Sequence, residues 1–302
     1  MSPRRSPGAV RRALAPAGGG RVGPTSGRRR ALGQHFLRDP AVADRIVSLV
    51  APTTRDVVVE IGPGDGALTA LLAGTGARLV AVEVDRALAA LLRERFAGVA
   101  RVEVVEADAR RFDYRALRDL RPDPGGRALA VGNLPYSVGT AILQALVAAG
   151  PGIDEMALML QKEVAARVAA PPGGKSYGSL SLLVQMACDV RLAFSVGPGA
   201  FRPPPLVDSA VVHLRALAAP RVPPGAAAGF ERLVRAAFSR RRKTLANAVA
   251  GGLGLPPERA RDLIASAGID PGRRAETLSL AEFAELAARF VPGGGRGGDN
   301  PS

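Results

Sequence analysis

Short apolar runs alternate with stretches of helical spacing through the first half of the chain, and this order constrains the fold more than any other feature. The apolar runs lie at 57–61, 79–83, 102–106, 128–131 and 155–161, and helical spacing is found at 41–50, 67–73, 86–96 and 140–149. Strands joined through helices form βαβ units and a mainly parallel sheet. Ligands of such sheets bind beyond the carboxyl ends of the strands. The sequence therefore predicts an α/β domain whose site lies where these strands end.

Composition divides the rest of the chain. Residues 1–27 are rich in Arg, Gly and Pro and lack acidic residues, so we expect a disordered basic tail. The α/β domain is expected over 28–218, and a Pro-, Ala- and Gly-rich stretch at 216–228 is expected to be a linker. Helical spacing at 230–249, 257–267 and 280–290, the last capped by Ser279, predicts a small all-helical domain over 221–292, followed by a flexible tail over 293–302.

The chain carries a formal net charge of +14, which indicates a polyanionic partner, either nucleic acid or an anionic membrane surface. Eight Arg within residues 1–30 account for +8 of this charge, so the remainder is only moderately basic at +6. Arg binds phosphate through a planar fork better than Lys does. A GC-rich genome explains the abundance of Arg equally well, so the composition leaves both readings open.

Targeting and redox signals are few. There is no run of roughly 18 or more apolar residues and no apolar N-terminal segment, so we expect neither a membrane span nor a secretory signal, and we place the protein in the cytoplasm. The Arg-rich N-terminus is also compatible with an organelle transit peptide, a weaker alternative to a disordered tail. The single cysteine, Cys188, is expected in the core, and the two histidines, His35 and His213, are too isolated to predict a metal site.

A glycine-rich turn follows the first strand of the predicted sheet. Residues 60–66 read Glu-Ile-Gly-Pro-Gly-Asp-Gly, and glycines at such a turn let the backbone approach a ligand closely. Cofactors such as NAD, FAD and S-adenosylmethionine all bind at this crevice. The spacing of Gly62, Gly64 and Gly66 does not match the dinucleotide fingerprint G-x-G-x-x-G. It favours a ligand without phosphate at this turn, such as the methionine part of S-adenosylmethionine.

Acidic residues end the next two strands. Glu83 lies 21 residues after Gly62, where a carboxylate can accept hydrogen bonds from both ribose hydroxyls. Asp108 ends the third strand, where its carboxylate or neighbouring backbone can contact an adenine amine. Either acid alone could be a solvated residue at a turn. Together with the glycine turn, the two acids form the pattern of a Rossmann-like class I methyltransferase sheet.

The fourth strand ends in the tetrapeptide Asn-Leu-Pro-Tyr at 133–136. Asn supplies both a carbonyl acceptor and an amide donor, and Tyr supplies a flat face on which a ring can stack. These groups suit a planar base with an exocyclic amine. Four residues alone are equally compatible with an ordinary strand-to-turn junction, and the other strand ends decide between the two.

With this tetrapeptide, the chain resembles the rRNA adenine-N6 dimethyltransferases, and further stretches narrow the resemblance to the bacterial small-subunit (16S) rRNA adenine-N6,N6-dimethyltransferase family. The resemblance covers about residues 30–290, and its other motifs lie at 32–37, 161–165, 177–181, 201–209 and 238–245. Position 35 is Asn in many members of the family and His here. That departure leaves the detailed hydrogen bond at this position open.

The resemblance implies S-adenosylmethionine-dependent dimethylation of N6 of two adjacent adenosines in a hairpin near the 3′ end of 16S rRNA, within the small ribosomal subunit. It implies a monomer with a role in subunit biogenesis, which binds the cofactor through residues 28–218 and RNA through 221–292. The residues carried over are the cofactor contacts His35, Leu37, Gly62, Gly64, Glu83, Asp108 and Asn133, the acceptor-site residues Asn133, Leu134, Pro135, Tyr136 and Phe201, and the RNA-binding residues Arg240, Arg241, Arg242 and Lys243.

The basic residues lie on the helix expected over 230–249, which holds a single acidic residue, Glu231. Such a run favours phosphate contact over the alternative of a solvated charged helix.

Other functions remain open at this stage. A large-subunit rRNA adenine methyltransferase of the macrolide-resistance type shares the cofactor site and the Asn-aromatic motif, but the segment at 161–181 and the Arg-Arg-Arg-Lys run favour the small-subunit enzyme. A DNA adenine methyltransferase shares only the chemistry of the tetrapeptide. A non-catalytic ribosome-assembly factor on the same fold is disfavoured by the intact site residues, and an NAD enzyme by the glycine spacing.

Overall fold

The computed structural model describes residues 35–240 and 242–290, so the expected tails at 1–27 and 293–302 and the predicted RNA-binding residue Arg241 lie outside it. Two compact units divide the chain. The first comprises the residues up to Ala169 together with Cys188–Ala218, and the second comprises Ala170–Ala187 together with the residues from Ala219 onward.

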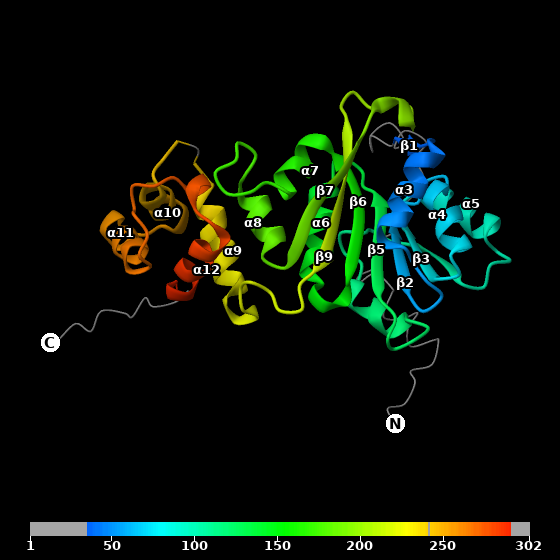
Figure 1. The fold of residues 1–302 in the computed structure, drawn as a ribbon, viewed down its shortest axis with the longest axis horizontal. Helices are drawn as coiled ribbons and strands as arrows, with labels where there is room; N and C mark the ends of the chain where they lie inside the picture. The colour runs from blue at the N-terminus through cyan, green and yellow to red at the C-terminus, as the bar shows by residue number, and fades with distance from the viewer. Residues whose placement is uncertain (1–34, 241, 291–302) are drawn as a thin grey trace. The chain divides into compact units, whose positions relative to one another are not determined.

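A seven-stranded sheet forms the centre of the first unit, in the order β4-β3-β2-β5-β6-β9-β7 (Figure 1). Pairing is parallel from β4 to β6, as the alternating pattern predicts, while β9 runs antiparallel to both β6 and β7. The strands are β2 (Val57–Ile61), β3 (Arg78–Glu83), β4 (Val102–Glu106), β5 (Ala128–Asn133), β6 (Glu155–Gln161), β7 (Cys188–Val196) and β9 (Ser209–Ala216).

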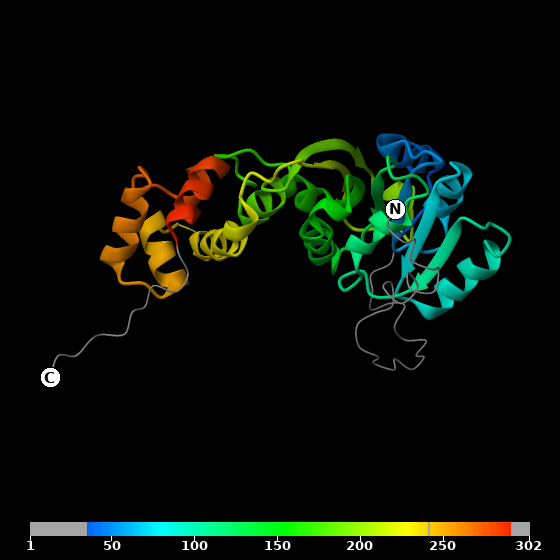
Figure 2. The same cartoon turned by 90° about the horizontal axis from the view of Figure 1, so that it is seen from below.

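Helices cover both faces of this sheet (Figure 2). The chain moves from β2 towards β4 through α4 and α5, and in the opposite direction from β5 to β6 through α6. Because such crossovers are right-handed, opposite directions place α4 and α5 on one face and α6 on the other. The helices of this unit are α3 (Pro40–Val50), α4 (Ala67–Gly74), α5 (Arg86–Arg95), α6 (Gly139–Ala148) and α7 (Lys162–Val168), with the 3-10 helices η1 (Tyr114–Leu120), η2 (Gly150–Gly152) and η3 (Pro198–Ala200).

A two-stranded ribbon joins the start of the described chain to a late segment. Strand β1 (Phe36–Leu37) pairs antiparallel with β8 (Phe201–Arg202), and the N–H of Arg38 donates to the carbonyl of Ala200 at 2.7 Å. The ribbon therefore fixes His35, the first residue described, beside residues some 170 positions later in the chain.

The antiparallel edge of the sheet was not expected. The sequence around Cys188 reads as an undifferentiated apolar stretch, and no strand was predicted at β7 or β9. In β9 nearly every residue is buried, so the alternation that identifies a half-exposed strand is missing. The prediction that Cys188 lies in the core is confirmed, because its side chain is buried at the start of β7.

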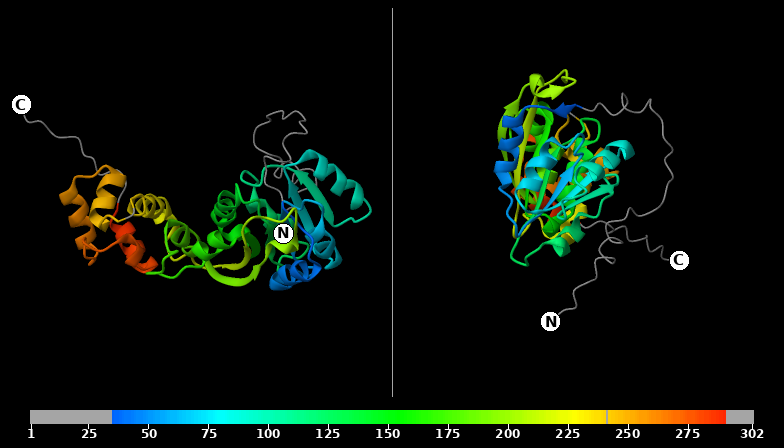
Figure 3. Two further views of the ribbon diagram at one scale, coloured as in Figure 1. Left: turned by 90° about the horizontal axis from the view of Figure 1, so that it is seen from above. Right: turned by 90° about the vertical axis from the view of Figure 1, so that its right-hand side faces the viewer.

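The second unit is built from helices, of which α9 to α12 are coloured yellow to red in Figure 3. Phe230 and Phe283 are fully buried at its centre. Tyr177 and Leu182 pack in the same cluster, which is why residues 170–187 belong to this unit and not to the one in which sequence patterning placed them. Its elements are α8 (Ser179–Gln185), α9 (Ala227–Ala237), α10 (Leu245–Leu253), α11 (Pro257–Ser266), α12 (Leu280–Arg289) and the 3-10 helices η4 (Pro224–Ala226) and η5 (Ala275–Thr277).

The prediction of a single helix over 230–249 is wrong. The helical path ends at Ala237 and resumes at Leu245, and α10 packs back against α9. Gly252 makes this close approach possible, because a Cβ there would lie 2.6 Å from the Cα of Ala236. Arg242, between the two helices, has a left-handed φ of 71° that interrupts a right-handed helix. At the other end of the unit, the predicted capping of α12 by Ser279 is confirmed by a capping box with Glu282.

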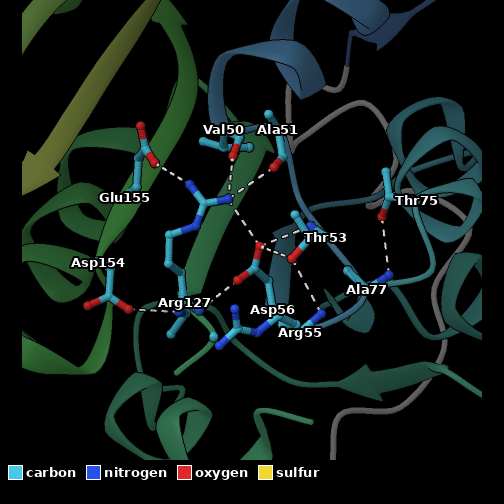
Figure 4. A network of polar contacts seen from close by, with 12 residues as sticks. Val50, Ala51, Thr53, Arg55, Asp56, Thr75, Ala77, Arg127, Asp154 and Glu155 are labelled. Atoms are coloured by element: carbon cyan, nitrogen blue, oxygen red, sulfur yellow. Dashed lines mark hydrogen bonds and ion pairs between the residues drawn. The ribbon is translucent and has the colours of Figure 1, made fainter. Parts of the chain in front are cut away.

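A network of polar contacts fixes the amino ends of the parallel strands, and Arg127 is at its centre (Figure 4). Its guanidinium donates to Asp56 at 3.0 Å, to Glu155 at 2.8 Å, and to the carbonyls of Val50 and Ala51 at 3.0 Å. Both carboxylates are buried, which raises their pKa values. Hydrogen bonds outweigh this effect and lower both values: Asp56 is bonded to Arg127 and Thr53, and Glu155 to Arg215 and His213. One side chain thus joins the end of α3 to the starts of β2, β5 and β6.

Arg127→Ala should lower the free energy of unfolding by about 1.5–3 kcal/mol, because it leaves the buried Asp56 carboxylate without its cationic partner, whereas Glu155 keeps its contacts with His213 and Arg215. Arg55→Ala is the matched control, since Arg55 pairs with Asp123 on an exposed surface, where ion pairs contribute little to stability. Urea denaturation followed by circular dichroism measures both. Equal losses in the two variants would contradict the role given to Arg127.

Candidate active site

One cavity of the first unit lies at the carboxyl ends of β2, β3 and β5 and beside the end of β4. It brings together residues that the sequence predicts for cofactor and acceptor, although they come from four strand ends and from the ribbon. The predicted residues that line it are His35, Leu37, Gly62, Gly64, Glu83, Asp108, Asn133, Leu134, Pro135 and Tyr136.

The glycine turn after β2 needs its glycines for two separate reasons. Gly62, Gly64 and Gly66 all have left-handed φ values, of 62°, 60° and 88°, which side chains disfavour. A Cβ on Gly64 would also lie 2.9 Å from the ring of Phe36, so β1 can cross the turn only because no side chain is there. The turn therefore presents bare backbone to the cavity beneath the ribbon.

Glu83 is held firmly at the end of β3. One of its carboxylate oxygens accepts the N–H of Gly64 at 3.2 Å, and the other accepts the N–H of Asp85 at 2.9 Å. Burial raises the pKa of the carboxyl group, against the effect of these two hydrogen bonds. The carboxylate is thus fixed in orientation before any ligand arrives, and each oxygen keeps acceptor capacity.

Asp108, after β4, is paired with Arg110, a contact that the sequence does not predict. The guanidinium of Arg110 forms a bidentate ion pair with its carboxylate, with an Nη2–Oδ2 distance of 2.6 Å, and the Arg110 N–H donates to the same group at 2.9 Å. The hydrogen bonds from Arg110 lower the pKa of Asp108. An adenine amine that approached this carboxylate would share it with an arginine.

Asn133 is oriented by the ribbon. Its side-chain Nδ2 donates to the backbone carbonyl of His35 at 2.9 Å, so its Oδ1 is the part of the amide left to accept a hydrogen bond. The N–H of Leu134 donates to the carbonyl of Met159 at 3.0 Å, which ties the motif to β6. Because Pro135 has no N–H, the peptide that joins it to Leu134 offers only its carbonyl. Two acceptors therefore lie on consecutive residues.

Tyr136 forms the aromatic wall of the cavity, together with His35. The two rings lie 5.5 Å apart between centroids and are tilted by 36°. The Tyr136 hydroxyl is hydrogen-bonded to the Ser209 hydroxyl at 2.6 Å, and burial raises the pKa of the phenol. His35 is fixed in turn by a 2.8 Å hydrogen bond between its Nδ1 and the carbonyl of Pro203. Its side chain therefore stands beside the acceptor motif, and its backbone carbonyl holds Asn133.

Phe201, expected as the second aromatic face, is not among the residues that line this cavity. Its side chain is 5% exposed and packs in the core beside Leu37, its neighbour across the ribbon. In this arrangement the rings that bound the cavity on the acceptor side are those of Tyr136 and His35.

The sequence model of the family described as "Ribosomal RNA adenine dimethylase" matches residues 26–291 of this chain. The chain belongs to this family. A "Ribosomal RNA small subunit methyltransferase A" from Geobacter sulfurreducens is 47% identical over 268 residues, which cover 88% of this chain and 96% of the relative. One from Pseudomonas aeruginosa is 43% identical over 263 residues, which cover 87% and 94%.

Solved structures of related enzymes share the fold of this family member. A dimethyladenosine transferase from Plasmodium falciparum superposes with a TM-score of 0.67 at 26% identity, covering 83% of this chain and 96% of that one. The 23S rRNA methyltransferase ErmE superposes with a TM-score of 0.63 at 26% identity, covering 84% and 98%. These likenesses confirm the Rossmann-like methyltransferase fold with a helical C-terminal part.

Glu60 is a further functional candidate, which the sequence patterns alone do not single out. It is 1% exposed, lines the cavity, and its Oε2 atom has no hydrogen-bond partner among the described residues. Burial raises its pKa to about 8. A cationic ligand in the cavity would favour the charged carboxylate. Its position just before the glycine turn is the one sequence feature that could have indicated a role.

Three of the basic residues predicted to bind RNA lie in the second unit, between α9 and α10. Arg240, Arg242 and Lys243 are all exposed, and they belong to a connecting segment and not to a helix. Arg235, on α9, is paired with Glu231 at 2.7 Å. The residues of the connecting segment therefore form a separate group from the charged face of α9.

Glu60→Gln should stabilise the ligand-free protein increasingly as pH rises. In the wild type the pKa of Glu60 is raised in the folded state. The contribution of its protonated form to the free energy of unfolding is therefore complete below about pH 4.5 and is lost as pH rises through about 8. Gln does not titrate, so the Tm difference between variant and wild type should grow between pH 6 and pH 9. Glu94→Gln, at an exposed position of α5, is the control. A Tm difference that does not change with pH would show that Glu60 is already charged at pH 6.

Proposed function

We propose that this protein transfers methyl groups from S-adenosylmethionine to N6 of two adjacent adenosines in the RNA of the small ribosomal subunit, and that it takes part in subunit biogenesis. The observation that carries the proposal is the meeting, in one cavity, of the glycine turn and Glu83 with the acceptor motif at 133–136. An rRNA substrate supports a cytoplasmic location. None of the helices in the described part of the chain has the length and apolar character of a membrane span.

The residues present fit S-adenosylmethionine. Gly62 presents backbone to the cavity, where a Cβ would lie 3.9 Å from the carbonyl oxygen of Asn133, and the Glu83 carboxylate keeps acceptor capacity for ribose hydroxyls. The unpartnered oxygen of Glu60 suits a positively charged group, and the cofactor carries both an ammonium and a sulfonium. When bound, the cofactor supplies an electrophilic methyl group on that sulfonium.

The chain's own residues would activate the acceptor amine. Adenine N6 is a poor nucleophile because its lone pair is delocalised into the ring. The Oδ1 of Asn133 and the carbonyl of Leu134 can each accept one N6 hydrogen, which draws the nitrogen towards a tetrahedral shape and aims its lone pair. The ring of Tyr136 would hold the base by stacking, which contributes about 1–3 kcal/mol. Positioning and electrostatics then account for most of the acceleration.

The choice of subunit is supported by sequence similarity. The relatives named as small-subunit methyltransferases are 43–47% identical over nearly their full length, whereas the 23S rRNA enzyme is 26% identical. The fold is common to both, so the cavity alone does not distinguish a large-subunit methyltransferase of the macrolide-resistance type. The retained acceptor and cofactor residues argue against a purely non-catalytic assembly factor.

Asn133→Ala should reduce methyl transfer to undermethylated small ribosomal subunits by at least about a hundredfold, because it removes a hydrogen bond made to the reacting amine. RNA affinity should stay within about twofold of the wild type, since the phosphate contacts that dominate affinity are untouched. Transfer of labelled methyl groups and filter binding measure the two quantities. Asn247→Ala, at an exposed position of α10, is the matched control. Near-normal methyl incorporation by the Asn133 variant would refute the assignment.

We further propose that the exposed cations between α9 and α10 contact RNA phosphates. The double variant Arg240→Ala/Arg242→Ala should weaken binding to small subunits and reduce the slope of log affinity against log salt by about 1–2, as expected for two lost phosphate contacts. Arg259→Ala/Arg261→Ala removes the same charge from exposed positions on α11 and is the control. Equal slopes in the two double variants would contradict a specific role for this segment.

A further inference from the structure

The connection between β8 and β9 presents a large apolar side chain to solvent. Leu206 is 103% exposed, the highest value among the exposed large apolar side chains of the described residues, and Val207 beside it is 46% exposed. Single exposed apolar residues are common on protein surfaces and need no special role. The position of Leu206 gives it one.

Both ends of this connection are anchored to the acceptor site. At its start, the carbonyl of Pro203 is hydrogen-bonded to the ring of His35. At its end, Ser209 is hydrogen-bonded to the Tyr136 hydroxyl, and Asp208 accepts the N–H of Lys162 at 2.9 Å and pairs with its ammonium at 3.0 Å. The rings so contacted are those that bound the acceptor side of the cavity.

The connection is also stiff and short. Residues 203–205 are three consecutive prolines, whose rings fix φ and restrict each preceding residue. Leu206 is three residues from each of the two anchors, Pro203 and Ser209, so its Cα lies within about 11 Å of both. A large apolar side chain on a stiff connection is therefore exposed to solvent near the residues that hold the rings of His35 and Tyr136.

A base that is stacked in RNA must leave its neighbours before N6 can reach Asn133, and this unstacking costs free energy. Proteins that unstack bases often insert an apolar side chain between them. We propose that Leu206 is such a wedge, which enters the base stack beside the target adenosine and stabilises its displaced position. The inference rests on the proposed function and adds the residue that prepares the substrate.

The surroundings favour RNA over another protein as the occupant. Arg202, at the start of the connection, is exposed, and the chain outside residues 1–30 is still basic by +6. Arg202 therefore offers a cation to an RNA phosphate four residues from Leu206, and the basic chain attracts a polyanion in general.

The test compares two substrates. One is the undermethylated small ribosomal subunit, and the other is the same subunit reconstituted with an abasic nucleotide next to the target adenosine, so that the target has lost a stacking partner. Leu206→Ala should lower kcat/KM about tenfold on the first substrate and less than about twofold on the second, where unstacking is already cheap. Leu206→Met, which keeps an apolar side chain of similar size, should retain activity on both. Leu91→Ala removes a half-exposed leucine from α5 and should change neither value.

Each outcome decides one question. Equal losses for Leu206→Ala on both substrates would make Leu206 an ordinary RNA contact, and no loss on either would remove it from substrate handling. Both results overturn the wedge while leaving the methyltransferase intact. If the wild type methylates neither substrate, the proposed function itself fails.

Discussion

Parallel pairing of β2 with β3 and β5 brings the main polar groups of the cavity to one edge of the sheet. In this arrangement the strands all point the same way, so the glycine turn, Glu83 and Asn133 follow neighbouring strand ends. The same geometry explains why Arg127 is needed at the opposite edge, where the amino ends of the strands meet the end of α3. The apolar strands supply the core. The residues of the cavity follow their carboxyl ends, and the Arg127 network stabilises their amino ends.

The ribbon of β1 and β8 is the second constraint. It crosses the glycine turn where Phe36 meets Gly64, and it presents the carbonyl of His35 to Asn133. This single hydrogen bond occupies the Nδ2 atom of Asn133 and leaves its Oδ1 to accept a hydrogen bond from a ligand. It also links cofactor and acceptor sites, because one short segment contacts the glycine turn on one side and the Asn-Leu-Pro-Tyr motif on the other. The histidine at position 35 has that role through its backbone, while its ring, hydrogen-bonded to the Pro203 carbonyl, lies beside the ring of Tyr136.

Local patterns were sufficient to predict the parallel strands, since each combines a buried apolar run with a polar residue at its end. They were not sufficient for β7 and β9, whose pairing depends on contacts between distant segments. The break between α9 and α10 was missed because the sequence there favours helix locally, whereas Gly252 lets the chain fold back. His35 lines the cavity, as the family resemblance implies. The pairing of Asp108 with Arg110 and the burial of Phe201 depend on side-chain packing, which the spacing of motifs along the sequence does not predict.

The most direct test of the account is the product formed on the ribosomal subunit. Purified protein is incubated with undermethylated small subunits and S-adenosylmethionine labelled in its methyl group, and the RNA is then digested to nucleosides. The account predicts N6,N6-dimethyladenosine at two adjacent positions of the small-subunit RNA. Label confined to large-subunit RNA offered in parallel, or an absence of dimethyladenosine, would contradict it.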